Sequence, residues 1–164
     1  MASKRTSKKP APLVAIMTGS PSDLPVVEGA TKILDMLGIP SELKVLSAHR
    51  TPERVTAYIE KAEQGGVEVF IACAGMAAHL AGAVAAQTLK PVIGVPLASG
   101  AIGGFDALLA TVQMPPGIPV ATVGVDGSKN AAYLAARILA ASRPEITKRI
   151  EKDLQQQRKR YDKV

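Results

Sequence analysis

The sequence predicts an α/β protein of the flavodoxin- or Rossmann-like type, with three layers: a five-stranded parallel sheet and helices on both of its faces. Three observations lead to this prediction. Short β-type runs alternate with helical segments at a spacing of roughly 25 residues, which is typical of βαβ units. The central β-type runs are apolar on both faces, as a sheet covered on both sides requires. With 164 residues, 47% of them hydrophobic, the chain has enough apolar surface for a proper core.

Five short β-type runs predict the strands, in order along the chain: 13–18, 42–46, 67–73, 91–95 and 119–123. A loop and then a helical segment follow each run: 23–37, 52–64, 77–89, 104–113 and 129–142, with an extra C-terminal helix over 144–160. The helix starts are well marked. Thr51, Pro52 and Glu53 provide an N-cap, a proline at the first helical position and an acidic residue in the first turn. Gly38 and Gly65 fit helix ends.

The basic charge of the chain is concentrated at its two ends. The net charge is +6, from 20 basic and 14 acidic residues. Residues 1–12 and 148–164 account for the excess, so that the central part is nearly neutral. We expect 1–12 to be a disordered basic tail and 13–164 to be a single domain that includes the C-terminal helix. A nearly neutral fold with 3% aromatic residues and no Trp argues against a nucleic-acid partner, and RNA binding by the tail is a weaker alternative.

The single cysteine and the absence of a targeting signal indicate a cytoplasmic protein. Cys73 has no partner for an intramolecular disulfide, and we expect it to be a small core residue. The basic start of the chain precedes only the short apolar run 13–17, which is too short for a signal peptide. The weakly polar stretch 70–86 is expected to form a strand and a buried helix, so that no membrane partner is predicted.

Three loops that follow predicted strands are the candidate ligand-binding segments: 19–23, 47–51 and 74–79. Ligands of open parallel sheets bind beyond the carboxyl ends of the strands, near the switch in strand order. Each loop has small residues at the start of a helix, where free N–H groups and the helix dipole favour an anion. Hydroxyl groups and Arg50 add donors suited to a phosphate.

Both histidines of the chain lie in or beside these loops. His49 directly follows a strand and adjoins Arg50, so we predict a functional role in proton transfer. His79 is predicted one turn into an apolar helix, where a histidine considered alone is expected to be a hydrogen-bonded core residue. Asp23 either binds a ligand or merely favours the dipole at the start of its helix.

Several other site chemistries are poorly supported by the residues. Two histidines thirty residues apart, one cysteine and no clustered carboxylates do not form a metal-binding set. The first loop matches neither a Walker A motif nor a dinucleotide fingerprint. A hydrolase triad of Ser20, His49 and Asp23 is conceivable, but the chain has no nucleophile elbow. The residues alone therefore predict a small phosphate-bearing ligand, possible proton transfer at His49, and no metal.

The same loops resemble those of the PurE family of purine biosynthesis, over residues 13–160. Six segments carry the resemblance in the same order along the chain: 19–23 (GSPSD), 47–52 (SAHRTP), 74–80 (AGMAAHL), 94–96 (GVP), 113–120 (QMPPGIPV) and 130–132 (NAA). The resemblance implies an isomerase, a 5-(carboxyamino)imidazole ribonucleotide mutase that moves carboxylate from an exocyclic nitrogen to ring carbon 4. It also implies a homo-octamer with active sites at subunit interfaces and no cofactor.

The resemblance also implies roles for individual residues. His49 matches the catalytic proton shuttle at carbon 4. The implied substrate-binding residues are Asp23 for ribose hydroxyls, Ser22, Ser47 and Arg50 for phosphate, Ser20 in a loop that closes over the nucleotide, and Gly75 and His79 in the loop that shapes the carboxylate pocket.

The chain departs from the family pattern at three positions. Met76 stands where a second Gly is usual, Ala81 where Pro is usual, and Thr18 where Met is usual. A second branch of the family carboxylates aminoimidazole ribonucleotide directly with carbon dioxide, and Arg50 and His79 favour the mutase branch instead. Direct carboxylation, and a non-catalytic nucleotide-binding paralogue suggested by Met76, are the alternatives.

Overall fold

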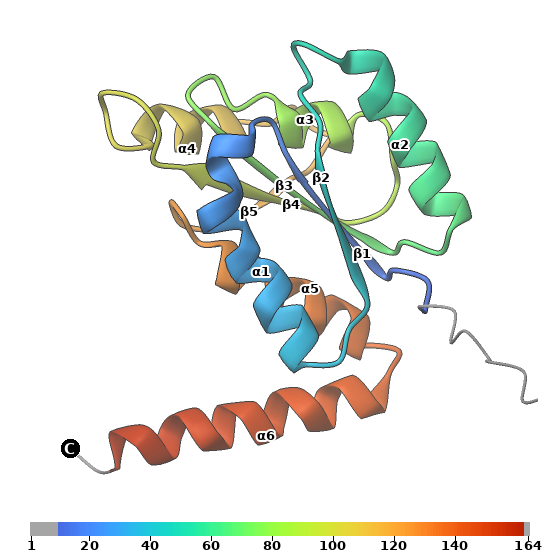
Figure 1. Cartoon of the computed structure of the whole chain (residues 1–164), viewed down its shortest axis with the longest axis vertical. Coiled ribbons are helices and arrows are strands. Elements are labelled where there is room, and N and C mark those ends of the chain that lie inside the picture. Colours follow the sequence, from blue (N-terminus) through green and yellow to red (C-terminus); the bar gives the residue numbers. More distant parts are fainter. Residues whose placement is uncertain (1–9, 163–164) are drawn as a thin grey trace, which may run out of the picture.

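A computed structural model describes residues 10–162 of the chain. The expected tail, 1–12, therefore lies outside the described residues except for its last three. The sheet has five parallel strands in the order β2-β1-β3-β4-β5, which confirms the predicted fold class (Figure 1). The strands are β1 (Val14–Thr18), β2 (Ser41–Val45), β3 (Val69–Gly75), β4 (Val92–Leu97) and β5 (Ala121–Thr122).

Helices separate the strands along the chain. A short 3-10 turn, η1 (Pro21–Asp23), leads directly into α1 (Leu24–Met36), and the others are α2 (Pro52–Gln64), α3 (Leu80–Ala85), α4 (Phe105–Val112), α5 (Ser128–Ala140) and α6 (Pro144–Tyr161). The predicted start of α2 is confirmed, with Pro52 as its first residue after the N-cap Thr51. Among the described helices, none is both long enough and apolar enough to cross a membrane.

The sheet separates two apolar cores, as the three-layer prediction requires. Val14 and Ile16 of β1 face the core formed with α1 and α5, whereas Ala15 and Met17 face the core formed with α2 and α3. All four side chains are fully buried. Because successive side chains alternate between the two faces and Val14–Met17 are all apolar, both faces need a helical cover.

The C-terminal helix α6 packs outside the α1 and α5 layer and runs across the bottom of Figure 1. Ile146 and Ile150 bury its first half against the core. Arg149 donates from Nη1 to the carbonyl oxygens of Leu37 and Gly38, at 3.1 and 3.0 Å, where α1 ends. These contacts satisfy carbonyl groups that the end of a helix leaves without partners.

Two elements are shorter than predicted by three residues or more. The helix expected over 77–89 begins only at Leu80 and ends at Ala85. Met76 and Ala78 adopt φ angles of +55° and +45°, so the chain makes a left-handed turn where the helix was expected to begin. The strand expected over 119–123 is reduced to Ala121–Thr122 at the sheet edge. Pro119 has no N–H group to donate to the ladder, which favours the shorter strand.

The strand order creates a switch point between β1 and β3. The chain passes from β1 outward to β2 and then returns to the other side of β1. The loops after β1, β2 and β3 consequently lie together at the upper end of the sheet in Figure 1. This is the position at which open parallel sheets bind ligands.

Candidate active site

A cavity of about 440 Å³ lies at the carboxyl ends of β1, β2 and β3. Its walls are the three loops that the sequence singled out, together with one residue from the loop after β4. All eight predicted site residues line it: Ser20, Ser22, Asp23, Ser47, His49, Arg50, Gly75 and His79. The fold therefore brings together side chains that are up to 59 positions apart in the chain.

The first loop holds a chain of hydroxyl groups around one carboxylate. The Oγ atoms of Ser20 and Ser22 are 2.7 Å apart, and Ser22 Oγ donates to Asp23 Oδ1 at 3.3 Å. Thr18, at the end of β1, donates from Oγ1 to Asp23 Oδ2 at 2.9 Å. Ser20 also caps η1, because its Oγ accepts from the Ser22 N–H at 3.3 Å. Both oxygens of Asp23 are thus held by neighbouring hydroxyls.

The second loop is a compact turn that ends at the start of α2. Ser47 Oγ accepts from the N–H of Arg50 at 3.2 Å, and Thr51 Oγ1 donates to the Ser47 carbonyl at 3.1 Å. The Ser47 N–H donates in turn to Thr51 Oγ1 at 3.2 Å. These bonds fix the backbone, and they leave the Ser47 hydroxyl hydrogen and the exposed guanidinium of Arg50 for a ligand.

The two histidines form a direct contact at the mouth of the cavity. His49 Nε2 lies 2.6 Å from His79 Nδ1, and the rings meet edge to face at 84° with centroids 4.8 Å apart. One of these two nitrogens must carry the hydrogen and the other must accept it. Both residues are exposed. The expectation that His79 is a core residue one turn into a helix is therefore wrong, because the left-handed Ala78 places His79 immediately before α3.

The third loop is pressed against the loop that follows β4. A Cβ atom on Gly75 would lie 1.6 Å from Ser99 Oγ, so only glycine permits this approach. Met76 is 61% exposed, lines the cavity and reaches the backbone of Gly100. Ala81 is buried in α3.

Sequence reasoning missed the contributions of Ser99 and Thr18. Ser99 lines the cavity, and it follows β4 closely. The rule that selected the other three loops, applied to the loop after β4, would have found it. Thr18 was noted only as a departure from a family pattern. Its bond to Asp23 joins residues five positions apart across a turn, and no local signal in the sequence indicates it.

Cys73 lies beneath the cavity in β3 and is fully buried, so its prediction as a core residue is confirmed. Burial raises the pKa of its thiol well above the usual range, and the nearby Asp23 carboxylate raises it further. The thiol is therefore protonated at neutral pH and is not a nucleophile.

The geometry of the cavity also bears on metal binding and on the hydrolase triad. Within residues 10–162, no group of three or more His, Cys, Asp and Glu side chains could hold a metal ion. The conceivable triad is not assembled, because Ser20 contacts Ser22 and His49 contacts His79. The arrangement instead provides one carboxylate, several hydroxyls, a guanidinium and an imidazole pair around one cavity.

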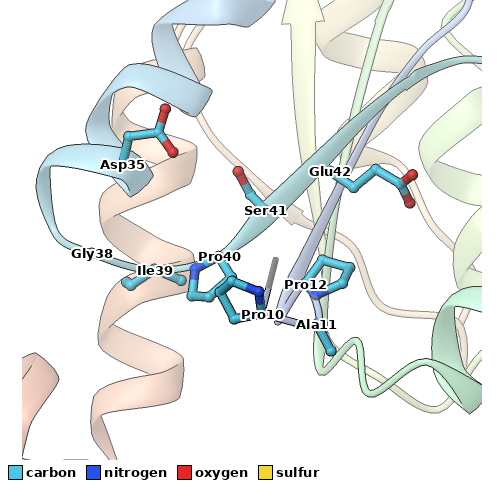
Figure 2. A pocket seen from close by; sticks show the side chains of 9 residues that line it. All are labelled: Pro10, Ala11, Pro12, Asp35, Gly38, Ile39, Pro40, Ser41 and Glu42. Atoms are coloured by element: carbon cyan, nitrogen blue, oxygen red, sulfur yellow. The ribbon is translucent and has the colours of Figure 1, made fainter. Parts of the chain in front are cut away.

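A second cavity, of about 560 Å³, lies at the opposite edge of the sheet, where β1 and β2 begin. Figure 2 shows Pro10, Pro12 and Pro40 close together among its lining residues, with the side chains of Asp35 and Glu42 farther away. Glu42 pairs there with Lys44 at 2.6 Å. This cavity offers no cationic side chain from its lining residues, so the predicted phosphate ligand is better suited to the first cavity.

Comparisons with known proteins identify the family of this chain. A family model described as AIR carboxylase matches residues 13–160. This chain belongs to the AIR carboxylase family. The match confirms the resemblance to PurE proteins that the loops indicated.

Two relatives named as mutases are similar to this chain over most of their length, and a third, longer relative is similar over part of its length. A Pyrococcus horikoshii protein named N5-carboxyaminoimidazole ribonucleotide mutase is 52% identical, over 94% of this chain and 88% of the relative. A Thermotoga maritima protein of the same name is 51% identical, over 85% of this chain and 82% of the relative. A longer Saccharomyces cerevisiae protein named phosphoribosylaminoimidazole carboxylase is 49% identical, over 89% of this chain and 26% of the relative.

The crystal structure of Treponema denticola PurE has the same fold. Its TM-score to this AIR carboxylase family member is 0.85 at 31% sequence identity, and the match covers 93% of this chain and 95% of the other. The parallel sheet and its helices are therefore those of a PurE protein.

Proposed function

We propose that this chain is an N5-carboxyaminoimidazole ribonucleotide mutase, an isomerase of purine biosynthesis that moves carboxylate from the exocyclic nitrogen of its substrate to ring carbon 4. The observation that carries the proposal is the cavity in which His49 lies among the loops that start three helices. The names of relatives at about half identity support the same activity.

The phosphate of the substrate is held in this proposal by the first two loops. Arg50 supplies a guanidinium, whose fork of donors suits phosphate oxygens. Ser22 and Ser47 add hydroxyl donors, and the start of α2 adds backbone N–H groups and the positive end of a helix dipole. These groups fix one end of the nucleotide.

The ribose is held by Asp23, whose carboxylate accepts hydrogen bonds from sugar hydroxyls, and the Ser20 loop closes over the nucleotide. The remaining lone pairs of Asp23 are available to a ligand, because Thr18 and Ser22 each occupy only one site on its two oxygens. With phosphate and ribose both fixed, the imidazole ring of the substrate has one orientation in the cavity.

His49 carries the proton in the proposed reaction. The bond from the exocyclic nitrogen to the carboxylate breaks, the nitrogen takes a proton, and carbon dioxide and aminoimidazole ribonucleotide form. Carbon 4 then attacks carbon dioxide, which gives a tetrahedral carbon that bears both hydrogen and carboxylate. His49 removes that hydrogen as a proton, which replaces the one delivered to nitrogen, so the cycle is balanced.

Carbon dioxide must stay in the cavity between the two steps. Gly75 and His79 border the region where it is released and recaptured. The close approach of Gly75 to Ser99 closes one wall of this region. Exclusion of water from such a pocket prevents loss of the intermediate.

Assembly and location are parts of the same proposal. The homo-octamer, with active sites at subunit interfaces, is supported by an exposed apolar face of α4 that carries Phe105, Leu109 and Val112 at helical spacing. The cytoplasmic location is supported by the single cysteine, and the single domain over 13–164 by the family match to 13–160. Light scattering on the purified protein measures the assembly directly.

The experiment that tests the function supplies the purified protein with N5-carboxyaminoimidazole ribonucleotide without added bicarbonate. We expect conversion to 4-carboxy-5-aminoimidazole ribonucleotide well above the spontaneous rate. No conversion there, with turnover of aminoimidazole ribonucleotide in bicarbonate, would instead identify a direct carboxylase, the activity named for the S. cerevisiae relative. Tight nucleotide binding without either reaction would identify a non-catalytic paralogue.

A further inference from the structure

The bond between Thr18 and Asp23 has a feature that ordinary helix capping does not explain. Asp23 ends η1 directly before α1, and its φ and ψ angles of −86° and −14° are already helical, so its side chain is not placed to accept from a backbone N–H of the first turn. Its side chain makes no such bond. It accepts instead from Thr18 Oγ1 at 2.9 Å and from Ser22 Oγ at 3.3 Å, and it lines the cavity.

The donor in this bond is held rigidly. Thr18 is the last residue of β1 and is fully buried. Its backbone carbonyl accepts from the N–H of Leu46 at 2.8 Å, at the start of the second loop. A buried β-branched side chain has a restricted χ1 angle, so its hydroxyl points in one direction. Asp23, by contrast, is partly exposed and follows a turn.

We propose that Thr18 is a positioning residue that holds the Asp23 carboxylate toward the ribose hydroxyls, and thereby sets selectivity for ribose over 2′-deoxyribose. The proposal deepens the proposed function and rests on it. Without the Thr18 hydroxyl, Asp23 Oδ2 loses the buried donor that fixes its direction, and the partly exposed carboxylate can rotate into other rotamers. In those rotamers, the sugar hydroxyls lose their acceptor.

A change of Thr18 to valine removes the hydroxyl and keeps the shape of the buried side chain. Asp23 is partly exposed and keeps access to water at the cavity, so we expect the protein to stay folded. A change of Thr18 to serine restores the hydroxyl with a smaller side chain. An Asp23→Asn variant, alone and combined with Thr18→Val, shows whether Thr18 acts through Asp23.

The test uses calorimetric titration of the full-length protein with aminoimidazole ribonucleotide and with its 2′-deoxy counterpart. We expect Thr18→Val to weaken binding of the ribonucleotide about five- to tenfold, since one acceptor to the sugar is lost part of the time. Binding of the deoxy form should weaken by a smaller factor, because it has only the 3′-hydroxyl to donate to Asp23. Thr18→Ser should restore the selectivity, and Thr18→Val should add nothing to Asp23→Asn. In turnover assays, KM should rise and kcat should stay within twofold.

Unchanged selectivity in Thr18→Val would overturn the proposal, and so would an equal loss of both ligands, which indicates a general disturbance of the cavity. A further loss when Thr18→Val is added to Asp23→Asn would show that Thr18 does not act through Asp23. Selective ribonucleotide binding without mutase turnover would refute the proposed function and leave the role of Thr18 supported. If the protein binds neither ligand, both proposals fail.

Discussion

Substitution of His49 and His79 tests whether only one of the two contacting rings transfers the proton. In the proposed reaction, His49 transfers the proton and His79 only contacts His49. The perturbations are His49→Asn and His79→Asn, made separately. Both side chains are exposed, so each change removes little apolar packing. We expect each variant to unfold within about 0.5 kcal/mol of the parent, as exposed substitutions usually do.

The expected losses of activity differ widely in size. Removal of a general acid or base costs about 10²- to 10⁴-fold in rate, so His49→Asn should remove most turnover. His79 contributes one hydrogen bond to His49, at 2.6 Å. A hydrogen bond of this kind contributes a net of about 1 kcal/mol, which corresponds to roughly a fivefold change in rate. His79→Asn should therefore retain about a fifth of the parent activity.

The assay is steady-state conversion of N5-carboxyaminoimidazole ribonucleotide, followed by chromatography of substrate and product. Thermal unfolding and light scattering of the same preparations check fold and assembly. Comparable turnover in His49→Asn would show that this ring is not the proton carrier. A loss in His79→Asn as large as that in His49→Asn would show that the second ring takes part in the chemistry itself.

Three further predictions follow from the cavity and its surroundings. Arg50→Ala should raise KM about 10- to 100-fold with little change in kcat, because a charged donor to the substrate phosphate is lost. An unchanged KM would contradict this role. Arg54→Ala, which lies outside the cavity, is the control. Gly75→Ala should lower the free energy of unfolding by about 1–3 kcal/mol in urea, because the new Cβ displaces Ser99. Gly19→Ala, whose Cβ meets nothing within 4 Å, should be tolerated, and equal stabilities of the two variants would refute the steric argument. Because burial raises the pKa of the Cys73 thiol, iodoacetamide at pH 8 should label it only after unfolding, and rapid labelling of the native protein would count against its burial.

The local signals in the sequence predicted the regular elements well. Short β-type runs marked all five strands, and a cap with proline placed the start of α2 at Pro52. Such signals depend on residues that are neighbours in the chain, so they need no knowledge of packing. The failure at α3 has the opposite cause. Met76 and Ala78 adopt left-handed angles that their residue types disfavour, so only the surrounding loops determine the turn.

The candidate site divides in the same way. Its three loops were predictable, because parallel strands end at one edge of the sheet and the loops after them meet there, and the family resemblance selected eight residues within them. The partners of these residues were not. The contact of His49 with His79 spans 30 positions, and the approach of Gly75 to Ser99 spans 24. Contacts of this kind depend on how two loops pack, to within a fraction of the size of an atom.

The amino-acid sequence alone determined three properties of this protein: the order of its strands and helices, its family, and the edge of the sheet that carries the candidate site. These properties follow from apolar periodicity and from short motifs. The tertiary structure alone decided which groups are in contact. These contacts are His49 with His79, Gly75 with Ser99, and Thr18 with Asp23. The physical reason is that hydrogen bonds and steric contacts act over a few ångströms. Residues far apart in the chain reach that range only after the cores on both faces of the sheet have formed.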